Sequence, residues 1–209
     1  MDNNIKELFN NISKHIMEDE KPSNYLNYLY EKGELERYPF NMISSLKSIE
    51  QSPKYHPEGS VWNHIMLVLD NAALKKNRSC DIKVFMWAVL LHDIGKSTTT
   101  KIRKGRITSY NHDIEGEKLA KEFLSNFTQD EEFIKRVSML VRWHMQPLYV
   151  NKNLSFKNIE SMKKEVPIKE VALISLCDRL GRGGMTEEKI KEEKENIRNF
   201  LYKCKSCNK

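Results

Sequence analysis

The sequence predicts an all-α fold, and two observations carry this prediction. Apolar residues recur at intervals of three and four along almost the whole chain, which is the spacing of helices with one buried face. The 209 residues are 39% hydrophobic and 31% charged, a length and a balance that suit one globular domain with a substantial core. Because no internal repeat or low-complexity linker divides the chain, we expect a single domain over residues 1–209.

The first three helices are predicted in the N-terminal third. The apolar residues of 5–16 lie at helical spacing and predict an amphipathic opening helix. A short second helix follows and stops at Gly33. Residues 52–59, with two prolines and a glycine, predict a loop. This loop leads into a helix at 61–69, whose apolar inner face includes His64.

The middle of the chain is expected to form the buried centre of the fold. A helix at 82–91 is apolar on most sides, which is typical of a buried element. We expect Gly95 to cap the C-terminal end of this helix, which would place His92 and Asp93 at the mouth of the core. Residues 97–110 are rich in threonine and predict a short irregular or hairpin excursion.

Four more helices are predicted near 113–127, 130–144, 168–181 and 186–203. The last one alternates glutamate and lysine around apolar residues at helical spacing, so we expect a solvated outer helix with internal ion pairs and no binding tail. Beyond it, Cys204 and Cys207 form a lone CxxC pair. A zinc site needs two more ligands, so the pair predicts a loose thiol tail.

The formal net charge of +6 suits polyanionic partners such as nucleotides or RNA. The basic residues are spread along the chain, however, and a lysine-rich surface without such a partner would show the same composition. No apolar run approaches the roughly 20 residues that span a bilayer, and the N-terminus has no signal-peptide stretch. We therefore expect a cytoplasmic protein with no membrane partner; the oligomeric state stays open.

Histidine and aspartate residues recur beside the apolar helical segments. Six of them form what we call the His/Asp set: His64, His92, Asp93, His112, His144 and Asp178. Neutral imidazoles and carboxylates are the ligands of borderline divalent metals. A carboxylate such as Asp178 on an apolar helix face is costly to bury unless it is paired or bound to a metal. One histidine alone could be a hydrogen-bonded core residue, but the six together predict a metal site.

The His/Asp set resembles the H…HD…D signature of the HD-domain metal-dependent phosphohydrolases. The neighbouring residues extend this resemblance to the HD module of bacterial CCA-adding tRNA nucleotidyltransferases. The runs that carry it are YHPEGSVWNH at 55–64, LHDIGK at 91–96, YNHD at 110–113 and VRWHM at 141–145. They imply an HD-domain helical bundle with a motif-bearing core of about residues 35–185, between N-terminal helices and a charged C-terminal helix. No nucleotidyltransferase half accompanies them, so we expect a stand-alone HD domain.

The resemblance also implies which residues bind metal. The first ion would be held by His64, His92, Asp93 and Asp178. A second ion would bind His112 and His144, with Asp93 as the bridge between the two. Mixed imidazole and carboxylate ligation is compatible with Mn, Fe, Co, Ni or Zn, and we expect one or two such ions per chain. Two ions could clamp a phosphate and activate water for its hydrolysis.

Four further side chains are candidates for binding the substrate. Lys96 follows His92 and Asp93 closely enough to lie at the same opening of the core, where its ammonium could contact a phosphate. Arg182 lies one helical turn beyond the last aspartate of the His/Asp set and would face the same side. Arg142 and His56 lie near other members of the set, although the cations could be ordinary surface charges and His56 could cap a turn. We expect Asp93, Lys96 and Arg182 to act in catalysis.

The resemblance implies an enzyme that acts on nucleotide-like phosphomonoesters or phosphodiesters, as a 2′,3′-cyclic phosphodiesterase and phosphatase, on free nucleotides or RNA ends. Two alternatives stay open. One is hydrolysis of dinucleoside polyphosphates, which related small HD proteins carry out; the other is a non-catalytic module that binds RNA or nucleotides. The intact His/Asp set favours catalysis, because a pure binding module has no need of six metal ligands.

Overall fold

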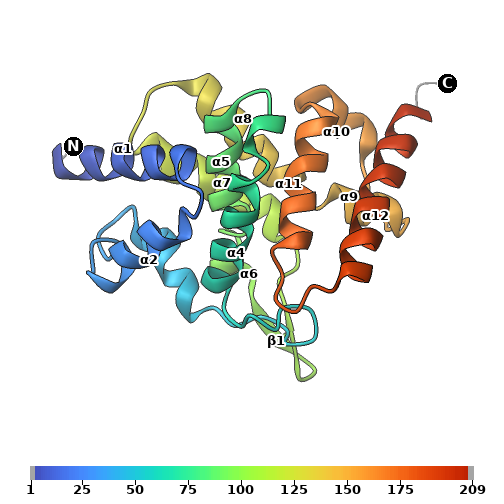
Figure 1. Ribbon diagram of the computed structural model, residues 1–209, viewed down its shortest axis with the longest axis horizontal. Helices are drawn as coiled ribbons and strands as arrows, with labels where there is room; N and C mark the ends of the chain where they lie inside the picture. The colour runs from blue at the N-terminus through green and yellow to red at the C-terminus, as the bar shows by residue number, and fades with distance from the viewer. Residues whose placement is uncertain (1–2, 207–209) are drawn as a thin grey trace.

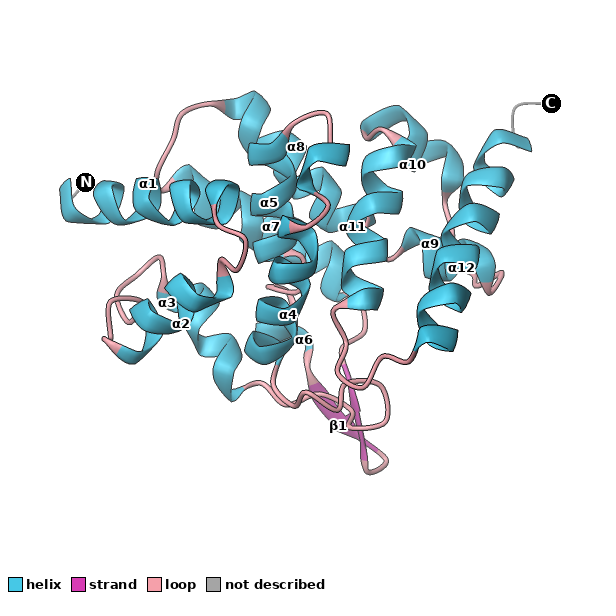
Figure 2. Ribbon diagram, viewed as in Figure 1, coloured by secondary structure: helices cyan, strands magenta, loops and turns pink. Residues whose placement is uncertain are grey.

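The computed structural model describes residues 3–206 and confirms the all-α prediction (Figure 1). The helices are α1 (Asn3–Glu18), α2 (Ser23–Glu31), α3 (Asn41–Ser44), α4 (Val61–Ala73), α5 (Ile82–Leu91), α6 (Lys96–Thr99), α7 (His112–Ser125), α8 (Glu131–Trp143), α9 (Gln146–Asn151), α10 (Ile159–Glu165), α11 (Ile168–Leu180) and α12 (Glu187–Ser206), with 3₁₀ turns η1 (Ser45–Ser48) and η2 (Lys76–Arg78). The predicted excursion contains α6 and an antiparallel hairpin of β1 (Lys101–Arg103) and β2 (Arg106–Thr108), which projects from the bundle (Figure 2).

The helix α5 forms the centre of the bundle, as its apolar sequence predicts. Asp81 begins the helix, because its side chain accepts a hydrogen bond from the backbone N–H of Val84 at 3.1 Å. The residues from Val84 to Leu91 are all buried. Helices α1, α4, α8 and α11 pack around α5. The end of α5 therefore carries His92 and Asp93 into the middle of the molecule.

The structure corrects the predicted role of Gly95. This residue has helical angles, φ −65° and ψ −15°, and precedes α6; α5 ends at Leu91. A Cβ atom at Gly95 would lie 2.0 Å from the carbonyl oxygen of His112 and 2.6 Å from the backbone nitrogen of Gly116. Glycine is required here because the start of α7 presses against this turn. That close approach is what brings His112 to the end of α5.

A second glycine allows a similar approach between α11 and α4. A Cβ atom at Gly181 would lie 2.5 Å from Cγ2 and 2.6 Å from Cα of Val68. Atoms that are not bonded cannot approach so closely, so any other residue would separate the two helices. The end of α11, which carries Asp178, thus lies against α4, which carries His64.

The long predicted helices are present, whereas the sequence analysis does not predict α3, α6, α9 or α10. Each of these has at most seven residues, which is too short for an apolar period to be recognised. No helix within residues 3–206 combines the length and apolar character that a membrane crossing requires.

The C-terminal helix α12 packs against α9 and α11 and is largely exposed on its outer side. An ion pair within the helix, between Glu195 and Arg198 at 3.0 Å, agrees with the predicted solvated helix. Cys204 is fully buried in α12, so the prediction of a loose tail is wrong for this residue. Its partner in the CxxC pair, Cys207, lies outside the described residues.

Candidate metal centre

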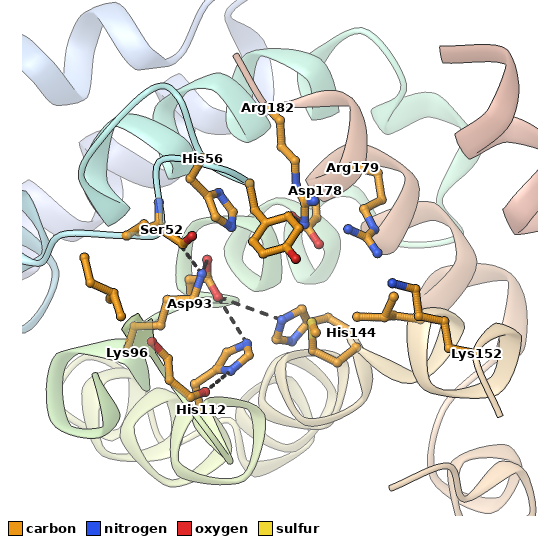
Figure 3. A pocket seen from close by; sticks show the side chains of 16 residues that line it. Ser52, His56, Asp93, Lys96, His112, His144, Lys152, Asp178, Arg179 and Arg182 are labelled. Carbon is orange, nitrogen blue, oxygen red and sulfur yellow. Dashed lines mark hydrogen bonds and ion pairs between the residues drawn. The ribbon is translucent and has the colours of Figure 1, made fainter. Parts of the chain in front are cut away.

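The structure brings the six residues of the His/Asp set together in the core. Four of them, Asp93, His112, His144 and Asp178, line a pocket (Figure 3). The six residues come from α4 (His64), the end of α5 (His92, Asp93), the start of α7 (His112), the end of α8 (His144) and α11 (Asp178). All six are buried. Five packed helices therefore fix the positions of the site residues, and the two close approaches at glycine bring α7 and α11 into place.

The Nδ1 atom of each of these four histidines lies beside a hydrogen-bond acceptor. In three of them the acceptor is the carbonyl oxygen three residues earlier: Val89 for His92 at 2.8 Å, Ser109 for His112 at 2.8 Å and Val141 for His144 at 2.6 Å. Because a carbonyl oxygen only accepts, Nδ1 carries the proton and Nε2 carries the lone pair when the ring is neutral. Such a hydrogen bond also holds the ring in place, as is usual for histidines that bind a metal through Nε2.

The carboxylate of Asp93 lies between the two pairs of histidines. Its Oδ2 atom lies 3.8 Å from Nε2 of His64 and 3.4 Å from Nε2 of His92. Its Oδ1 atom lies 3.4 Å from Nε2 of His112 and 3.9 Å from Nε2 of His144. The two oxygens of one carboxylate therefore face different ligand pairs, which is the arrangement that a bridging carboxylate needs between two ions.

The donor atoms fit a metal in two further respects. Nε2 of His92 is buried and has no hydrogen-bond partner, which is costly unless something binds it. Nε2 of His64 lies 3.1 Å from Oδ1 of Asp178. Two ligands that each lie about 2.0–2.2 Å from one ion are separated by roughly 3–3.5 Å, so these spacings suit a shared divalent cation.

The electrostatics of the site give Asp93 and His144 the protonation states that a metal requires, whereas the Asp93 carboxylate outweighs burial and raises the pKa of His92. Burial alone would raise the pKa of Asp93, but the Lys96 ammonium and the neighbouring imidazoles hold it well below its usual range. Burial, together with the adjacent His112 and His92 rings, lowers the pKa of His144 to about 4. At neutral pH Asp93 is therefore ionised and His144 is neutral, and both are ready to coordinate.

Lys96 is buried at the edge of the site. Its ammonium lies 2.7 Å from Oδ2 of Asp93 and 2.7 Å from Oε1 of Gln51. All three residues line the pocket. The position fits the predicted contact with substrate, and the ion pair also compensates the charge of a buried carboxylate.

Glu58 is a site residue that the sequence analysis missed. Its Oε1 atom accepts hydrogen bonds from Nδ1 of His64 at 2.8 Å and of His56 at 2.9 Å, and its Oε2 atom accepts one from the backbone N–H of Gly183 at 3.0 Å. These bonds hold the pKa of Glu58 well below its usual range, although burial alone would raise it. Glu58 thus fixes the His64 ring and joins it to the loop after Arg182. Its only signal was its place within the YHPEGSVWNH run.

The pocket above the His/Asp set has a volume of about 300 Å³. Of the predicted substrate contacts, Lys96, Arg182 and His56 line it. Arg142 lies outside this lining and forms an ion pair with Asp113 at 2.8 Å. The pocket also contains two cations that the sequence analysis did not select, which are Arg179 and Lys152 (Figure 3).

A helical bundle that encloses this His/Asp cluster has the fold of the HD-domain metal-dependent phosphohydrolases. Comparison with known families agrees: the model of the HD domain matches residues 61–183, which is more than half of the chain. The chain therefore belongs to the HD domain family.

Curated relatives at low identity are named multifunctional CCA proteins. The one from Alkalilimnicola ehrlichii is 26% identical over 183 residues, which cover 85% of this chain and 42% of the relative. The one from Nitrosospira multiformis is 25% identical over 181 residues, covering 83% of this chain and 41% of the relative. One from Burkholderia mallei is 38% identical over 88 residues, which are 42% of this chain and 20% of the relative. The chain thus spans about two fifths, or less, of the length of these relatives.

Proposed function

We propose that this protein is a metal-dependent hydrolase of nucleotide-like phosphomonoesters or phosphodiesters, with 2′,3′-cyclic phosphodiesterase and phosphatase activity. The observation that carries the proposal is the Asp93 carboxylate, whose two oxygens face separate histidine pairs at the floor of a cationic pocket. The resemblance to the HD modules of CCA-adding enzymes supports this class of substrate, since those modules are associated with the same activities.

Divalent ions held by the His/Asp set would supply a water of lowered pKa and neutralise charge on the phosphate oxygens. Asp93 would hold both ions through its two oxygens. Lys96 and Arg182 line the pocket and would contact phosphate oxygens, where an ammonium or a guanidinium stabilises the negative charge of the transition state. Glu58 would hold His64, and the loop that follows Arg182, in position through its three hydrogen bonds.

A substrate panel tests this proposal. The protein is stripped of metal, reloaded separately with Mn, Fe, Co, Ni or Zn, and assayed with 2′,3′-cyclic AMP, 2′-AMP, 3′-AMP and diadenosine tetraphosphate. We expect at least one metal to support hydrolysis of the cyclic nucleotide or of a monophosphate, and a chelator to abolish it.

Two results would contradict the proposal. Hydrolysis of diadenosine tetraphosphate alone would instead support the dinucleoside polyphosphate alternative. Binding of metal and nucleotide without any turnover, under all five metals, would support the non-catalytic alternative.

A further inference from the structure

We infer that the pocket contains a second anion subsite, formed by Arg179 and Lys152 with the help of Arg182, which binds an additional phosphate of the substrate. This inference rests on the proposed function and narrows it: the substrate would be a phosphate ester that carries a further phosphate group beyond the one that reacts. Neither Arg179 nor Lys152 has a role in the metal centre. Their place in the pocket therefore points to another ligand.

The three cations lie along one wall of the pocket. Arg179 and Arg182 lie on the last turn of α11 and just beyond it, and Lys152 lies just after α9; all three line the pocket above the His/Asp set. Figure 3 shows Arg179 and Lys152 entering from the side of the pocket opposite Lys96, with the metal ligands between them. A substrate whose reacting phosphate lies over Asp93 could therefore extend toward Arg179 and Lys152.

Within residues 3–206, Arg179 and Arg182 have no close carboxylate partner. Their side chains are only 15% and 20% exposed, yet their carboxylate contacts are as long as 3.9 Å, to Glu193 and Asp178 respectively. Nε of Arg182 is buried without a hydrogen-bond partner. Arg142, at a similar exposure of 22%, instead has a carboxylate at 2.8 Å. Partly buried guanidinium groups without such a contact are suited to an anion from outside the chain.

Lys152 adds a third positive charge without a counter-charge. In the part of the chain that the structure describes, no carboxylate lies within ion-pair distance of its ammonium. Two cations that share a pocket wall repel each other unless an anion lies between them. A bound phosphate would remove that repulsion, because its several oxygens can accept from both groups at once.

The pocket has more positive than negative side chains. The pocket lining has four cationic side chains but only two carboxylates, Asp93 and Asp178, and both belong to the His/Asp set. Two divalent ions with these two carboxylates would leave a surplus of about two positive charges, which the singly charged cyclic phosphate and the attacking hydroxide would balance. Lys96 and Arg182 could contact that phosphate, but Arg179 and Lys152 then remain without a negative charge in the pocket. A second phosphate supplies it.

Several molecules offer that chemistry, and kinetics can distinguish them. Three substrates share a 2′,3′-cyclic phosphate as the reacting group: 2′,3′-cyclic AMP, the same nucleotide with an added 5′-phosphate, and the dinucleotide ApA with a 2′,3′-cyclic phosphate end. The second carries its extra anion as a terminal phosphate and the third as an internal phosphodiester. We expect KM to be lower by roughly ten- to a hundredfold for one of the two substrates that carry a second anionic group, which identifies the source of the second anion.

The variants Arg179→Met and Lys152→Met should lose this advantage while they hydrolyse 2′,3′-cyclic AMP as the wild type does. Their metal content and melting temperature should not change. Arg136→Met is the matched control, because Arg136 pairs with Asp81 at 2.8 Å and lies outside this pocket; it should keep the full preference. Equal KM values for the three wild-type substrates, or equal losses on all three in the variants, would overturn the subsite.

A binding measurement keeps this inference separate from the proposed function. Calorimetry compares adenosine 3′,5′-bisphosphate with 3′-AMP on the metal-loaded protein. Both ligands carry the 3′-phosphate, so they differ only in the 5′-phosphate that the subsite would bind, and no turnover is needed. We expect the wild type to bind the bisphosphate roughly ten- to a hundredfold more tightly, and the Arg179→Met, Lys152→Met double variant to bind the two ligands equally. If the protein hydrolyses nothing but shows this preference, the hydrolase proposal fails and the subsite stands; if the wild type binds both equally, the subsite fails.

Discussion

Replacement of Asp93 by alanine is expected to release the bound metal and to abolish hydrolysis. The Asp93 carboxylate faces both histidine pairs, so its loss removes a ligand from each proposed ion. Loss of a single group that stabilises a transition-state oxyanion costs roughly 10²–10³ in turnover, and Asp93 supports both ions, so we expect a loss of more than about 10³. Elemental analysis of the purified variant and an assay with the best substrate of the wild type measure the two effects.

The controls for this variant separate metal loss from unfolding. Asp93→Ala leaves the buried Lys96 ammonium without its carboxylate, which itself destabilises the fold, so Asp93→Asn is measured beside it. His144→Ala should keep the first ion and lose the second. His15→Ala, in α1 and hydrogen-bonded to Asp19, should change neither metal content nor rate. An Asp93→Ala protein that keeps the full metal content and rate would contradict the assignment.

Replacement of Gly95 by alanine should cause a large loss of stability. The added Cβ would lie 2.0 Å from the His112 carbonyl oxygen, and a backbone atom cannot move aside as a flexible side chain does. Overpacking typically costs about 1–3 kcal/mol, and we expect the upper end of this range or more. For a chain of this size that corresponds to a melting temperature lower by roughly 6–12 °C. Because α7 must move, the site of the second ion should also be weakened.

Gly105→Ala is the comparison for this variant. Gly105 lies in the hairpin with φ +71° and no atom within 4 Å of an added Cβ, so alanine there brings only the strain of a left-handed conformation, about 1–2 kcal/mol. Thermal unfolding of the metal-free proteins measures both. Equal melting temperatures for Gly95→Ala and Gly105→Ala would show that the close approach of α7 is not needed.

The sequence predicts the clustering of the His/Asp set better than it predicts the residues around that cluster. The six residues of the His/Asp set lie in or beside long apolar helices, whose period is strong enough to place them on inner faces. Glu58 could not be found in this way, because it lies in an irregular loop where no period shows which way a side chain points. Arg142 shows the reverse: it is only two residues from His144, yet it turns to Asp113.

The sequence does not reveal the other two pocket cations, Arg179 and Lys152, for related reasons. Arg179 follows Asp178 directly, and neighbours in a helix point about 100° apart, so adjacency gave no reason to place both in one pocket. Both reach it because the helix ends one residue later. Lys152 follows α9, which has only six residues and therefore no recognisable period. Close backbone approaches such as that at Gly95 depend on the packing of two distant segments, which the sequence of neither one shows.

Asp93 is proposed to bridge two ions held by the other members of the His/Asp set. Anomalous diffraction from a crystal of the wild-type protein, recorded at the absorption edge of the metal found by elemental analysis, tests this proposal most directly. We predict two anomalous peaks, one beside Oδ2 of Asp93 with His64, His92 and Asp178, and one beside Oδ1 with His112 and His144. A peak at only one of these positions, no peak at either in metal-loaded crystals, or a peak only beside His56, Glu58 and His64 would contradict this arrangement.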